Sequence, residues 1–175
     1  GYLEKLKQDA RMGQVEKLKE YLRETTPPHD YGRLLLLWTS TRVDGLIHKK
    51  QQQEIIKMVF SHQQADGGWS MRSFSTPEAW GGGNRADKLR GELEFKDPPS
   101  DGHQTGLAVI VLRDAGIAAE DPRIQKGVGW IQANQRESGR WWTRSLNTDK
   151  FHFITYSGSI YPLVALYKCG ELPND

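Results

Sequence analysis

Three side chains in this sequence could do acid–base chemistry: Asp30, Asp101 and His103. Each aspartate comes two residues after a Pro-Pro pair and just before an apolar segment. Because aspartate is strongly preferred at helix N-caps, we interpret Asp30 and Asp101 first as caps of two helices. A single imidazole with no assured partner makes a weak proton shuttle, so we interpret His103 as a histidine at the rim of the fold. The catalytic residue is therefore unassigned, with these three as candidates.

Four further side chains are candidates for contact with a ligand: Trp80, Trp142, Arg33 and Tyr156. The two indoles could stack on a bound molecule, although aromatic residues beside glycine-rich loops more often anchor the loop. Trp80 stands directly before Gly81-Gly82-Gly83, which fits the anchoring interpretation. Both interpretations stay open for the two tryptophans.

No cofactor and no metal site is predicted. Cys169 is the single cysteine, which excludes an internal disulfide framework and a multi-cysteine zinc site. We interpret it as a small hydrophobic residue at a helix end. Lys and Arg number 24 against 22 Asp and Glu, and the two signs are interspersed along the chain. The sequence therefore lacks the basic patch that nucleic acid or an anionic membrane surface requires.

The sequence shows no transmembrane or targeting segment. Its longest apolar runs, Leu34–Trp38 and Leu107–Leu112, are far shorter than the roughly 20 residues that span a bilayer. Gly1 is followed at once by a polar segment, which is typical of a chain that starts inside a longer protein. The cellular compartment is left open.

An internal repeat indicates which elements position these residues. Pro27-Pro28-His29-Asp30 recurs as Pro98-Pro99-Ser100-Asp101, at an offset of 71 residues. Each copy continues through an apolar segment and a glycine, and closes on the pattern QxxxGxW. These closing residues are Gln63, Gly67 and Trp69 in the first copy and Gln135, Gly139 and Trp141 in the second, at an offset of 72. A fixed period is the signature of stacked supersecondary units.

The repeated unit is predicted to be a pair of helices. The first helix, Tyr31–Val43 or His103–Ala115, is apolar nearly all round, as expected of a buried helix. The second carries a single apolar stripe, seen at Ile55, Ile56, Val59 and Phe60 and again at Ile124, Val128 and Ile131. Gly45 and Gly116 fit left-handed helix ends, and Asp101 and Asp121 fit N-caps. A third buried helix is expected at Tyr156–Lys168 and a shorter striped helix at Val15, Leu18 and Leu22. Alternation of buried and striped helices predicts a barrel with an inner and an outer ring.

The second repeat resembles a known family. Lys126–Trp141, KGVGWIQANQRESGRW, resembles the QW motif of the squalene-hopene and oxidosqualene cyclases. The matching positions are Lys126, Gly127, Trp130, Ile131, Gln135, Gly139 and Trp141. The first copy keeps Gln63, Gly67 and Trp69, but Glu54, Ile55 and Met58 replace the basic, small and aromatic residues. The resemblance covers roughly Asp30–Gly170 and extends to the β chains of protein prenyltransferases.

The resemblance implies an all-α fold, the α/α toroid. We predict one such domain over residues 1–175, with leading helices at 1–26, a first repeat at 27–69, a long loop insert at 70–97, a second repeat at 98–141 and a final inner-type helix at 142–175. It also implies that the motif glutamine lies against the tryptophan ring and bonds the backbone at the end of the next outer helix. Gln63 with Trp69 and Gln135 with Trp141 would inherit this structural role.

The resemblance also identifies what the chain lacks. Triterpene cyclases of this kind protonate an alkene with a DxDD acid, and no DxDD occurs here: Asp44 precedes Gly45, and Asp97 and Asp101 are separated by Pro98-Pro99-Ser100. Prenyltransferases hold zinc with an Asp and a Cys two residues apart and a distant His. No DxC occurs, and His152 is one residue too far from Tyr156 for the HxxY pattern of that family.

Thioester-containing complement domains share the toroid as well. Cys169-Gly170-Glu171 resembles part of their GCGEQ motif, but Lys168 and Leu172 replace its outer Gly and Gln. The acyl acceptor of that family is therefore absent from this sequence.

Three functions remain open at this point. The leading hypothesis is a cyclase-like toroid module that lacks the acid and either binds an apolar, isoprenoid-type molecule or serves as a scaffold. The alternative is a genuine triterpene cyclase or prenyltransferase whose acid lies outside this sequence. The third is a polysaccharide-processing toroid enzyme, for which Trp80, Trp142, Arg144 and His103 would suit sugar binding but no carboxylate pair is present.

The toroid also predicts how the candidate residues gather. Inner helices begin at one rim, so Asp30, Arg33, Asp101, His103 and Tyr156 are expected near one mouth, with the insert Ser70–Ser100 as a lid or a disordered strip beside it. Six or seven helices make about half of such a ring. Because large exposed apolar patches are uncommon, we expect the end helices to be capped by Tyr2–Arg23 or paired with another copy.

Overall fold

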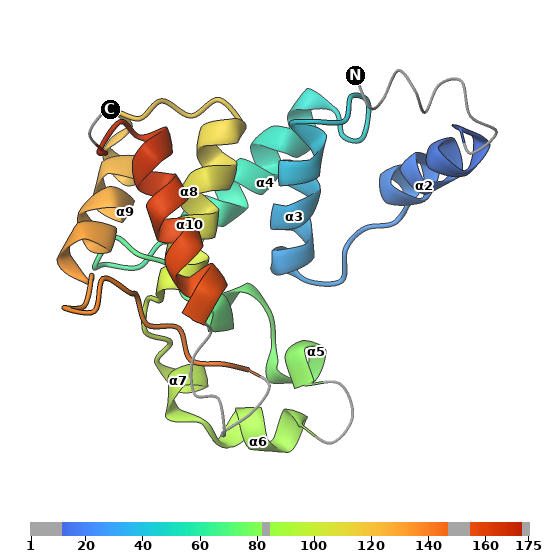
Figure 1. Cartoon of the computed structure of the whole chain (residues 1–175). Helices are drawn as coiled ribbons and strands as arrows, with labels where there is room; N and C mark the ends of the chain where they lie inside the picture. Colours follow the sequence, from blue (N-terminus) through green and yellow to red (C-terminus); the bar gives the residue numbers. More distant parts are fainter. Residues whose placement is uncertain (1–11, 82–84, 147–154, 173–175) are drawn as a thin grey trace.

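The computed structural model describes residues 12–81, 85–146 and 155–172. Within these ranges the regular elements are helices and none is a β-strand, so the predicted all-α class is confirmed. In chain order they are α2 (Met12–Glu24), α3 (Asp30–Ser40), α4 (Lys49–Ser61), the 3-10 helix η1 (Met71–Phe74), α5 (Pro77–Gly81), α6 (Ala86–Gly91), α7 (Leu93–Lys96), α8 (Gly102–Asp114), α9 (Pro122–Ala133) and α10 (Thr155–Lys168) (Figure 1). None of the helices in this part of the chain is long and apolar enough to cross a bilayer.

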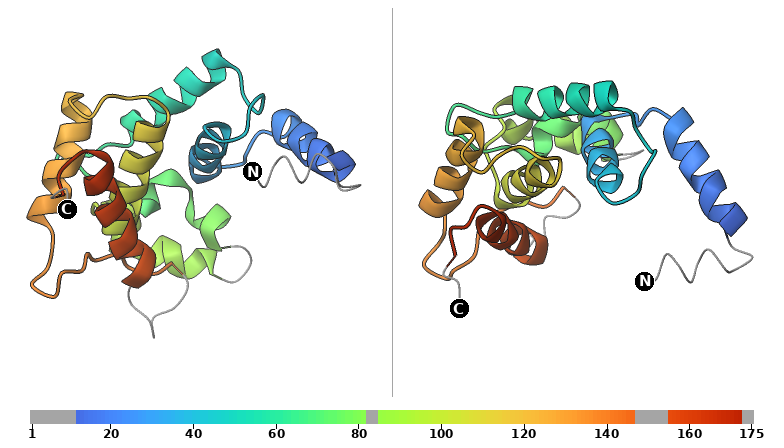
Figure 2. Two further views of the ribbon diagram at one scale, coloured as in Figure 1. Left: turned by 45° about the horizontal axis from the view of Figure 1, so that its top comes forward. Right: turned by 90° about the horizontal axis from the view of Figure 1, so that it is seen from above.

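The three apolar helices α3, α8 and α10 form an inner layer, and α4 and α9 lie outside it. The right view of Figure 2 shows the inner three nearly end-on, with α4 along one side and α9 along another. The central helix α8 is buried at every residue from Gly102 to Leu112. This matches its sequence, because a helix that is apolar all round has no side to offer to water.

Helices α8 and α10 pack closely because small residues line their contact. A Cβ atom at Gly106 would overlap the backbone of Tyr161 and Pro162, and one at Gly102 would lie 2.5 Å from both the Gly158 carbonyl oxygen and the Trp141 Cβ atom. Two helix backbones can approach this far only where one side chain is absent. The glycines of the sequence therefore determine how closely α8 and α10 can approach each other.

The helix ends agree with most of the predicted signals. Asp101 caps α8 by accepting a hydrogen bond from the Gln104 amide, and Asp121 caps α9 by accepting one from the Arg123 amide. Gly45 and Gly116 have positive φ values of 77° and 92°, as their places at helix ends predicted. These conformations are costly for any residue with a Cβ atom.

The predicted cap at Asp30 is wrong. His29 is the N-cap of α3, and its Nδ1 accepts a hydrogen bond from the Gly32 amide at 3.0 Å. Asp30 is the first residue of the helix, and its carboxylate contacts His62 Nε2 at 2.8 Å and Arg33 at 3.3 Å. The imidazole satisfies the orphan amide, so the carboxylate is available to link α3 to α4.

The insert at 70–97 is not the plain loop that was expected, because it contains the short helices η1, α5, α6 and α7. A buried ion cluster fastens it to the segment after α9. The Arg72 side chain, only 4% exposed, pairs with Glu92 at 2.9 Å and donates to the Arg144 carbonyl at 3.2 Å. Arg144 in turn pairs with Glu94 at 2.6 Å. Buried charges persist only where each is paired, so this cluster holds the insert in one place.

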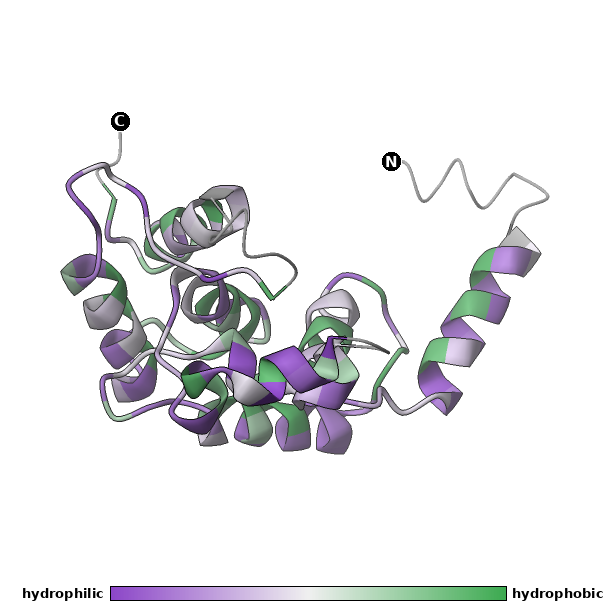
Figure 3. Ribbon diagram, turned by 90° about the horizontal axis from the view of Figure 1, so that it is seen from below, coloured by the Kyte–Doolittle hydropathy of each residue, from purple (hydrophilic) through white to green (hydrophobic). Residues whose placement is uncertain are grey.

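Helix α2 stands away from the other helices (Figures 1 and 2). Hydrophobic and hydrophilic bands alternate along it (Figure 3), yet Leu18 and Tyr21 are 58% and 59% exposed. Arg23 Nε donates a hydrogen bond of 2.7 Å to the Gly45 carbonyl. Within Met12–Arg23 the front segment therefore does not cap the inner layer, and the rest of that predicted cap, Tyr2–Arg11, lies outside the described residues.

Candidate functional site

Residues of all three inner helices lie in matching positions along one side of the inner layer. We call it the inner face, and it is formed by Tyr31, Trp38 and Arg42 of α3 and the turn after it, His103 and Asp114 of α8, and Ser157, Tyr161, Val164 and Lys168 of α10. Within each helix these residues follow the spacing i, i+4, i+7, i+11, which places them on one side of a helix. The positions also correspond between helices, since Tyr31 and Arg42 are each 72 residues before their partners on α8.

One end of the inner face is a neutral histidine between two hydroxyl groups. His103 Nδ1 lies 2.9 Å from Ser157 Oγ, and Nε2 lies 3.4 Å from Tyr31 Oη. The edge of the His103 ring also packs against Tyr161, with ring centroids 5.0 Å apart. Burial lowers the pKa of His103 to about 4, because the charged form would lose its hydration. At neutral pH the imidazole is therefore uncharged, with both nitrogens facing a partner.

Trp80 of the insert covers this end. Its ring lies edge-on to Tyr31 at 5.1 Å and stacks on the imidazole of His29 at 5.6 Å. Trp80 is partly exposed, whereas its buried indole nitrogen has no hydrogen-bond partner among the described residues. The contact joins the insert to the start of α3.

The other end of the inner face is a charged cluster around Asp114. Its carboxylate accepts hydrogen bonds from Trp38 Nε1 at 2.8 Å, Arg42 at 2.6 Å and Lys168 at 2.5 Å. Burial raises the pKa of Asp114, but the bonds from Lys168, Arg42 and Trp38 outweigh it and hold the pKa below its ordinary value. The group is an anion at neutral pH and cannot act as a proton donor.

An apolar strip separates these two ends. Trp38, Tyr161 and Val164, each partly buried against the core, form its accessible part, while Leu107 and Ile110 of α8 lie beneath them and are only 0% and 2% exposed. Eleven residues separate His103 from Asp114, which corresponds to about 16 Å along a helix. The surface thus combines an uncharged polar end, an apolar middle and an ionic end.

Asp101 does not reach this surface. Its Oδ1 accepts hydrogen bonds from the Gln104 amide at 2.9 Å and the Thr143 hydroxyl at 3.1 Å, and its Oδ2 accepts one from the Met71 amide at 2.7 Å. Burial raises the pKa of Asp101 to about 6, although these three bonds oppose the rise. Both oxygens are occupied by the backbone and by Thr143, so the carboxyl group joins α8 to η1 rather than facing a substrate.

The other predicted residues do not gather at the mouth as expected. Asp30 faces His62, the residue that follows α4, and Arg33 lies in the groove between α3 and α4. Tyr156 is 82% exposed on α10, and the Trp142 ring lies 5.6 Å from the guanidinium of Arg136. Asp30, Arg33 and Tyr156 all lie near the starts of inner helices. This does not bring their side chains together, because consecutive helical residues point 100° apart. His152 and Lys150, and Gly82 and Gly83 of the glycine run, lie outside the described residues.

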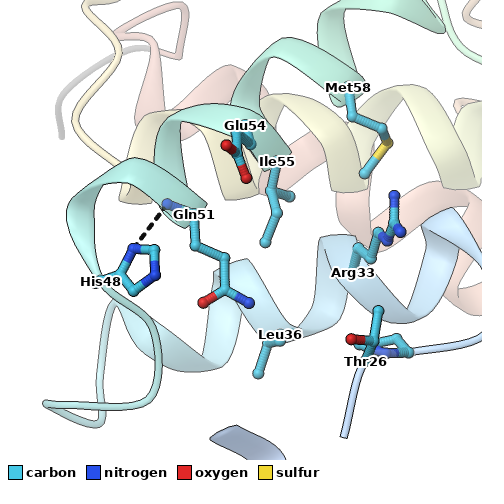
Figure 4. A pocket seen from close by; sticks show the side chains of 9 residues that line it. Thr26, Arg33, Leu36, His48, Gln51, Glu54, Ile55 and Met58 are labelled. Carbon is cyan, nitrogen blue, oxygen red and sulfur yellow. Dashed lines mark hydrogen bonds between the residues drawn. The ribbon is translucent and has the colours of Figure 1, made fainter. Parts of the chain in front are cut away.

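Arg33 lines a groove between α3 and α4 (Figure 4). Its volume is about 370 Å³, and Leu36, Ile55 and Met58 form its apolar part. His48, Gln51 and Glu54 form a polar border on α4. The inner face and this groove are on different sides of α3, because Tyr31 and Arg33 are two residues apart in the helix.

The first QW motif links the two repeats. Gln63 Nε2 donates to the Gly67 carbonyl and to the Arg123 carbonyl at the start of α9, both at 2.8 Å. Trp69 Nε1 donates to the Val59 carbonyl at 2.7 Å, and its ring covers Gly127, where a Cβ atom would lie 2.8 Å from Trp69 Cζ3. Gly67 is both in the left-handed region, with φ 92°, and in contact with the α9 backbone.

The second motif keeps only the local half of this arrangement. Trp141 Nε1 donates to the Ile131 carbonyl at 2.7 Å, as Trp69 does to Val59. Gln135 Nε2 donates to the Gly139 carbonyl at 3.0 Å, and among the described residues it makes no bond to a further repeat. The two tryptophans therefore make the same hydrogen bond to the preceding helix, while the glutamines differ.

Of the inner face, sequence reasoning singled out His103 and missed the other eight residues, which are Tyr31, Trp38, Arg42, Asp114, Ser157, Tyr161, Val164 and Lys168. A usable pattern existed, since Tyr31 and His103, and Arg42 and Asp114, are polar residues at equal offsets in two predicted inner helices. No group of three or more His, Cys, Asp or Glu side chains that could hold a metal ion occurs in the described ranges.

Comparison with known families agrees with this architecture. Residues 29–170 match the model of the squalene-hopene cyclase C-terminal domain. The chain belongs to that family. A search of curated proteins found no match. In this squalene-hopene cyclase C-terminal domain, the matched range begins at the cap of α3 and ends just after α10, so it contains both QW motifs and the whole inner face.

Proposed function

We propose that this squalene-hopene cyclase-type domain binds an apolar, isoprenoid-type molecule along the inner face and does not cyclise it. The observation that supports binding is the apolar strip itself, about 16 Å long and set between two polar ends. Such a surface matches a long hydrocarbon chain that carries a small polar group, because isolated polar groups at the ends fix orientation while apolar contacts supply affinity.

The chemistry of the face supports binding without cyclisation. Protonation of an alkene requires a strong carboxylic acid next to the substrate. Asp114 is ionised and bonded to Trp38, Arg42 and Lys168, and Asp101 is directed into the backbone of η1. The remaining group, His103, is neutral and bonded on both sides. Among the described residues the inner face thus offers no acid to an alkene.

The test compares two charge insertions of the same kind. Val164→Asp places a carboxylate in the apolar strip, and Leu93→Asp places one on α7 at a leucine that is already 77% exposed. Binding of geranylgeraniol and of squalene to the full chain is measured by isothermal titration calorimetry. We expect Val164→Asp to weaken binding at least tenfold, or about 1.4 kcal/mol, and Leu93→Asp to bind as the wild type does.

Two results would contradict the proposal. Absence of binding to the wild type, or equal binding by both variants, would remove the inner face as the binding surface. Extraction of the incubated protein followed by gas chromatography–mass spectrometry checks the second part, because a cyclised product from squalene would show that the domain is an active cyclase.

A further inference from the structure

Three side chains near the starts of α3 and α8 carry buried polar atoms that lack a hydrogen-bond partner among the described residues. These atoms are Trp80 Nε1, Ser75 Oγ, and both amide atoms of Gln104, Oε1 and Nε2. Gln104 is 0% exposed. A buried donor or acceptor without a partner is costly, because it gives up its bonds to water and gains none in return. Folded proteins keep few such groups, so their concentration in one region points to a ligand that supplies the partners.

Trp80 brings its unpartnered nitrogen to the His103 end of the inner face. Its ring lies edge-on to Tyr31, with ring centroids 5.1 Å apart, and the Tyr31 hydroxyl lies 3.4 Å from His103 Nε2. Because an indole N–H can only donate, its missing partner is an acceptor. The insert therefore adds an unused donor beside the aromatic rings at this end.

Gln104 and Ser75 place further unused groups at the same end of α8. Gln104 lies in the first turn of α8, directly after His103. Ser75 directly follows η1, and η1 is joined to the start of α8 by a hydrogen bond of 2.7 Å from the Met71 amide to Asp101 Oδ2. The Gln104 amide nitrogen, like the indole nitrogen, can only donate. Two of the four unpartnered atoms therefore require an oxygen atom on the ligand.

The charges around this end favour an uncharged ligand oxygen. Arg33 at the start of α3 is paired with Asp30, and Arg72 in η1 is paired with Glu92. His103 is neutral at physiological pH, because burial lowers its pKa to about 4. A phosphate group is normally bound by the N–H groups of arginine or by lysine. Since these cationic side chains already have carboxylate partners, the end suits an alcohol better than a diphosphate.

We propose that Trp80, Gln104 and Ser75 bind the hydroxyl group of a prenyl alcohol, whose hydrocarbon chain runs along the apolar strip toward Asp114. The ligand oxygen accepts hydrogen bonds from Trp80 Nε1 and Gln104 Nε2, and its proton is donated to Ser75 Oγ. This inference rests on the proposed function, to which it adds the class of the polar group and the direction of the ligand on the inner face.

The first experiment follows the indole N–H of Trp80 by NMR spectroscopy of the isotope-labelled full chain. The chain has six tryptophans, and Trp80→Phe identifies the Trp80 resonance by removing it. Geranylgeraniol is expected to shift this resonance downfield, because a new hydrogen bond deshields the proton. The matching hydrocarbon without the hydroxyl group is expected to shift it much less. Equal shifts with both molecules would overturn the proposal.

The second experiment measures affinities by isothermal titration calorimetry. Trp80→Phe keeps an aromatic ring and removes the N–H group, and Trp142→Phe is the matched control at a tryptophan outside the insert. We expect Trp80→Phe to bind geranylgeraniol about fivefold to tenfold more weakly than the wild type and to bind the hydrocarbon equally well. The control should match the wild type for both molecules. Geranylgeranyl diphosphate should bind about tenfold more weakly than the alcohol, because its charge would be buried without a partner.

The third experiment separates ligand binding at Gln104 from packing. Gln104→Leu replaces an unpartnered amide by an apolar group of similar size, so the urea midpoint of the free protein is expected to rise. The preference for the alcohol over the hydrocarbon is expected to fall. Gln53→Leu, at an exposed position of α4, is the matched control. A lower midpoint together with an unchanged preference would show that the amide has a structural role alone.

The results distinguish failure of this inference from failure of the proposed function. If neither the alcohol nor the hydrocarbon binds, both fail. If both bind equally well and Trp80→Phe changes neither affinity, the inner face still binds an apolar molecule, but the three side chains do not recognise its polar group. Tighter binding of the diphosphate than of the alcohol would also overturn the inference.

Discussion

The buried pair Asp101 and His103 predicts an unusual dependence of stability on pH. Both side chains are almost completely buried at the start of α8, and burial shifts their pKa values in opposite directions, to about 6 for Asp101 and about 4 for His103. Between about pH 4 and 6.5 the unfolded chain binds a proton at His103 and the folded chain does not, so the free energy of unfolding rises with pH. Asp101 behaves in the reverse way, since the folded chain keeps a proton that the unfolded chain has lost.

The size of each effect follows from the shifts. One pKa unit corresponds to about 1.4 kcal/mol, so a shift of His103 from 6.5 to about 4 gives roughly 3 kcal/mol. A shift of Asp101 from 3.8 to about 6 gives a similar amount with the opposite sign. In the wild type the two contributions nearly cancel between pH 4 and 6. Removal of one group should expose the other.

The assay is urea unfolding followed by circular dichroism at several pH values from 4 to 7. Relative to the wild type, His103→Gln should lose roughly 3 kcal/mol of stability as the pH rises from 4 to 6.5, and Asp101→Asn should gain a similar amount. The double variant should return toward the wild-type slope. Parallel profiles for the wild type and both single variants would refute the reasoning, because they would show that neither group is shifted by burial.

Three further predictions concern the packing of the repeats. Trp69→Ala should lower the free energy of unfolding in urea by about 3–5 kcal/mol, because Trp69 is fully buried. Trp142 is 44% exposed, so Trp142→Ala should cost less than about 1 kcal/mol. Equal losses would contradict the role of the QW tryptophan. Gln63→Ala should lower the free energy of unfolding by about 1–3 kcal/mol, because Gln63 donates a hydrogen bond to the Arg123 carbonyl of the next repeat. Gln135→Ala should lower it by less, because the Gln135 bond stays within its own loop. A larger loss for Gln135→Ala would contradict this prediction. Arg72→Met should cost about 3–5 kcal/mol, because it leaves the buried Glu92 with only the longer contact of 3.7 Å to Arg144. Proteolysis within residues 85–97 should also become faster, and an unchanged cleavage rate would show that the ion cluster does not hold the insert.

The helical framework could be predicted from sequence because its determinants are local and repeated. The offsets of 71 and 72 residues aligned the two helix pairs, and the caps at Asp101 and Asp121 and the turns at Gly45 and Gly116 depend on neighbours within a few residues. The cap of α3 was assigned one residue late, since His29 is a less common cap than aspartate and competes with it only in the folded geometry.

The candidate site was harder to predict because it depends on residues far apart in the chain. The short helices of the insert have four to six residues each, too few for a periodic pattern. The Arg72 cluster joins residues separated by up to 72 positions, and charge alone does not reveal such a partner. The equivalence of Lys168 with Arg42 became visible only when α10 was seen beside α8, because α10 follows α8 at a different spacing from the repeat.

The central claim is that an apolar molecule lies on the inner face, and photoaffinity labelling tests it most directly. The full chain is irradiated with a benzophenone-bearing farnesol analogue, and the labelled residues are mapped by peptide mass spectrometry. The account predicts labels at Trp38, Tyr161 and Val164, suppressed by excess geranylgeraniol. Labels confined to the exposed side chains of α10, such as Tyr156 and Tyr167, or to the groove between α3 and α4 would contradict it.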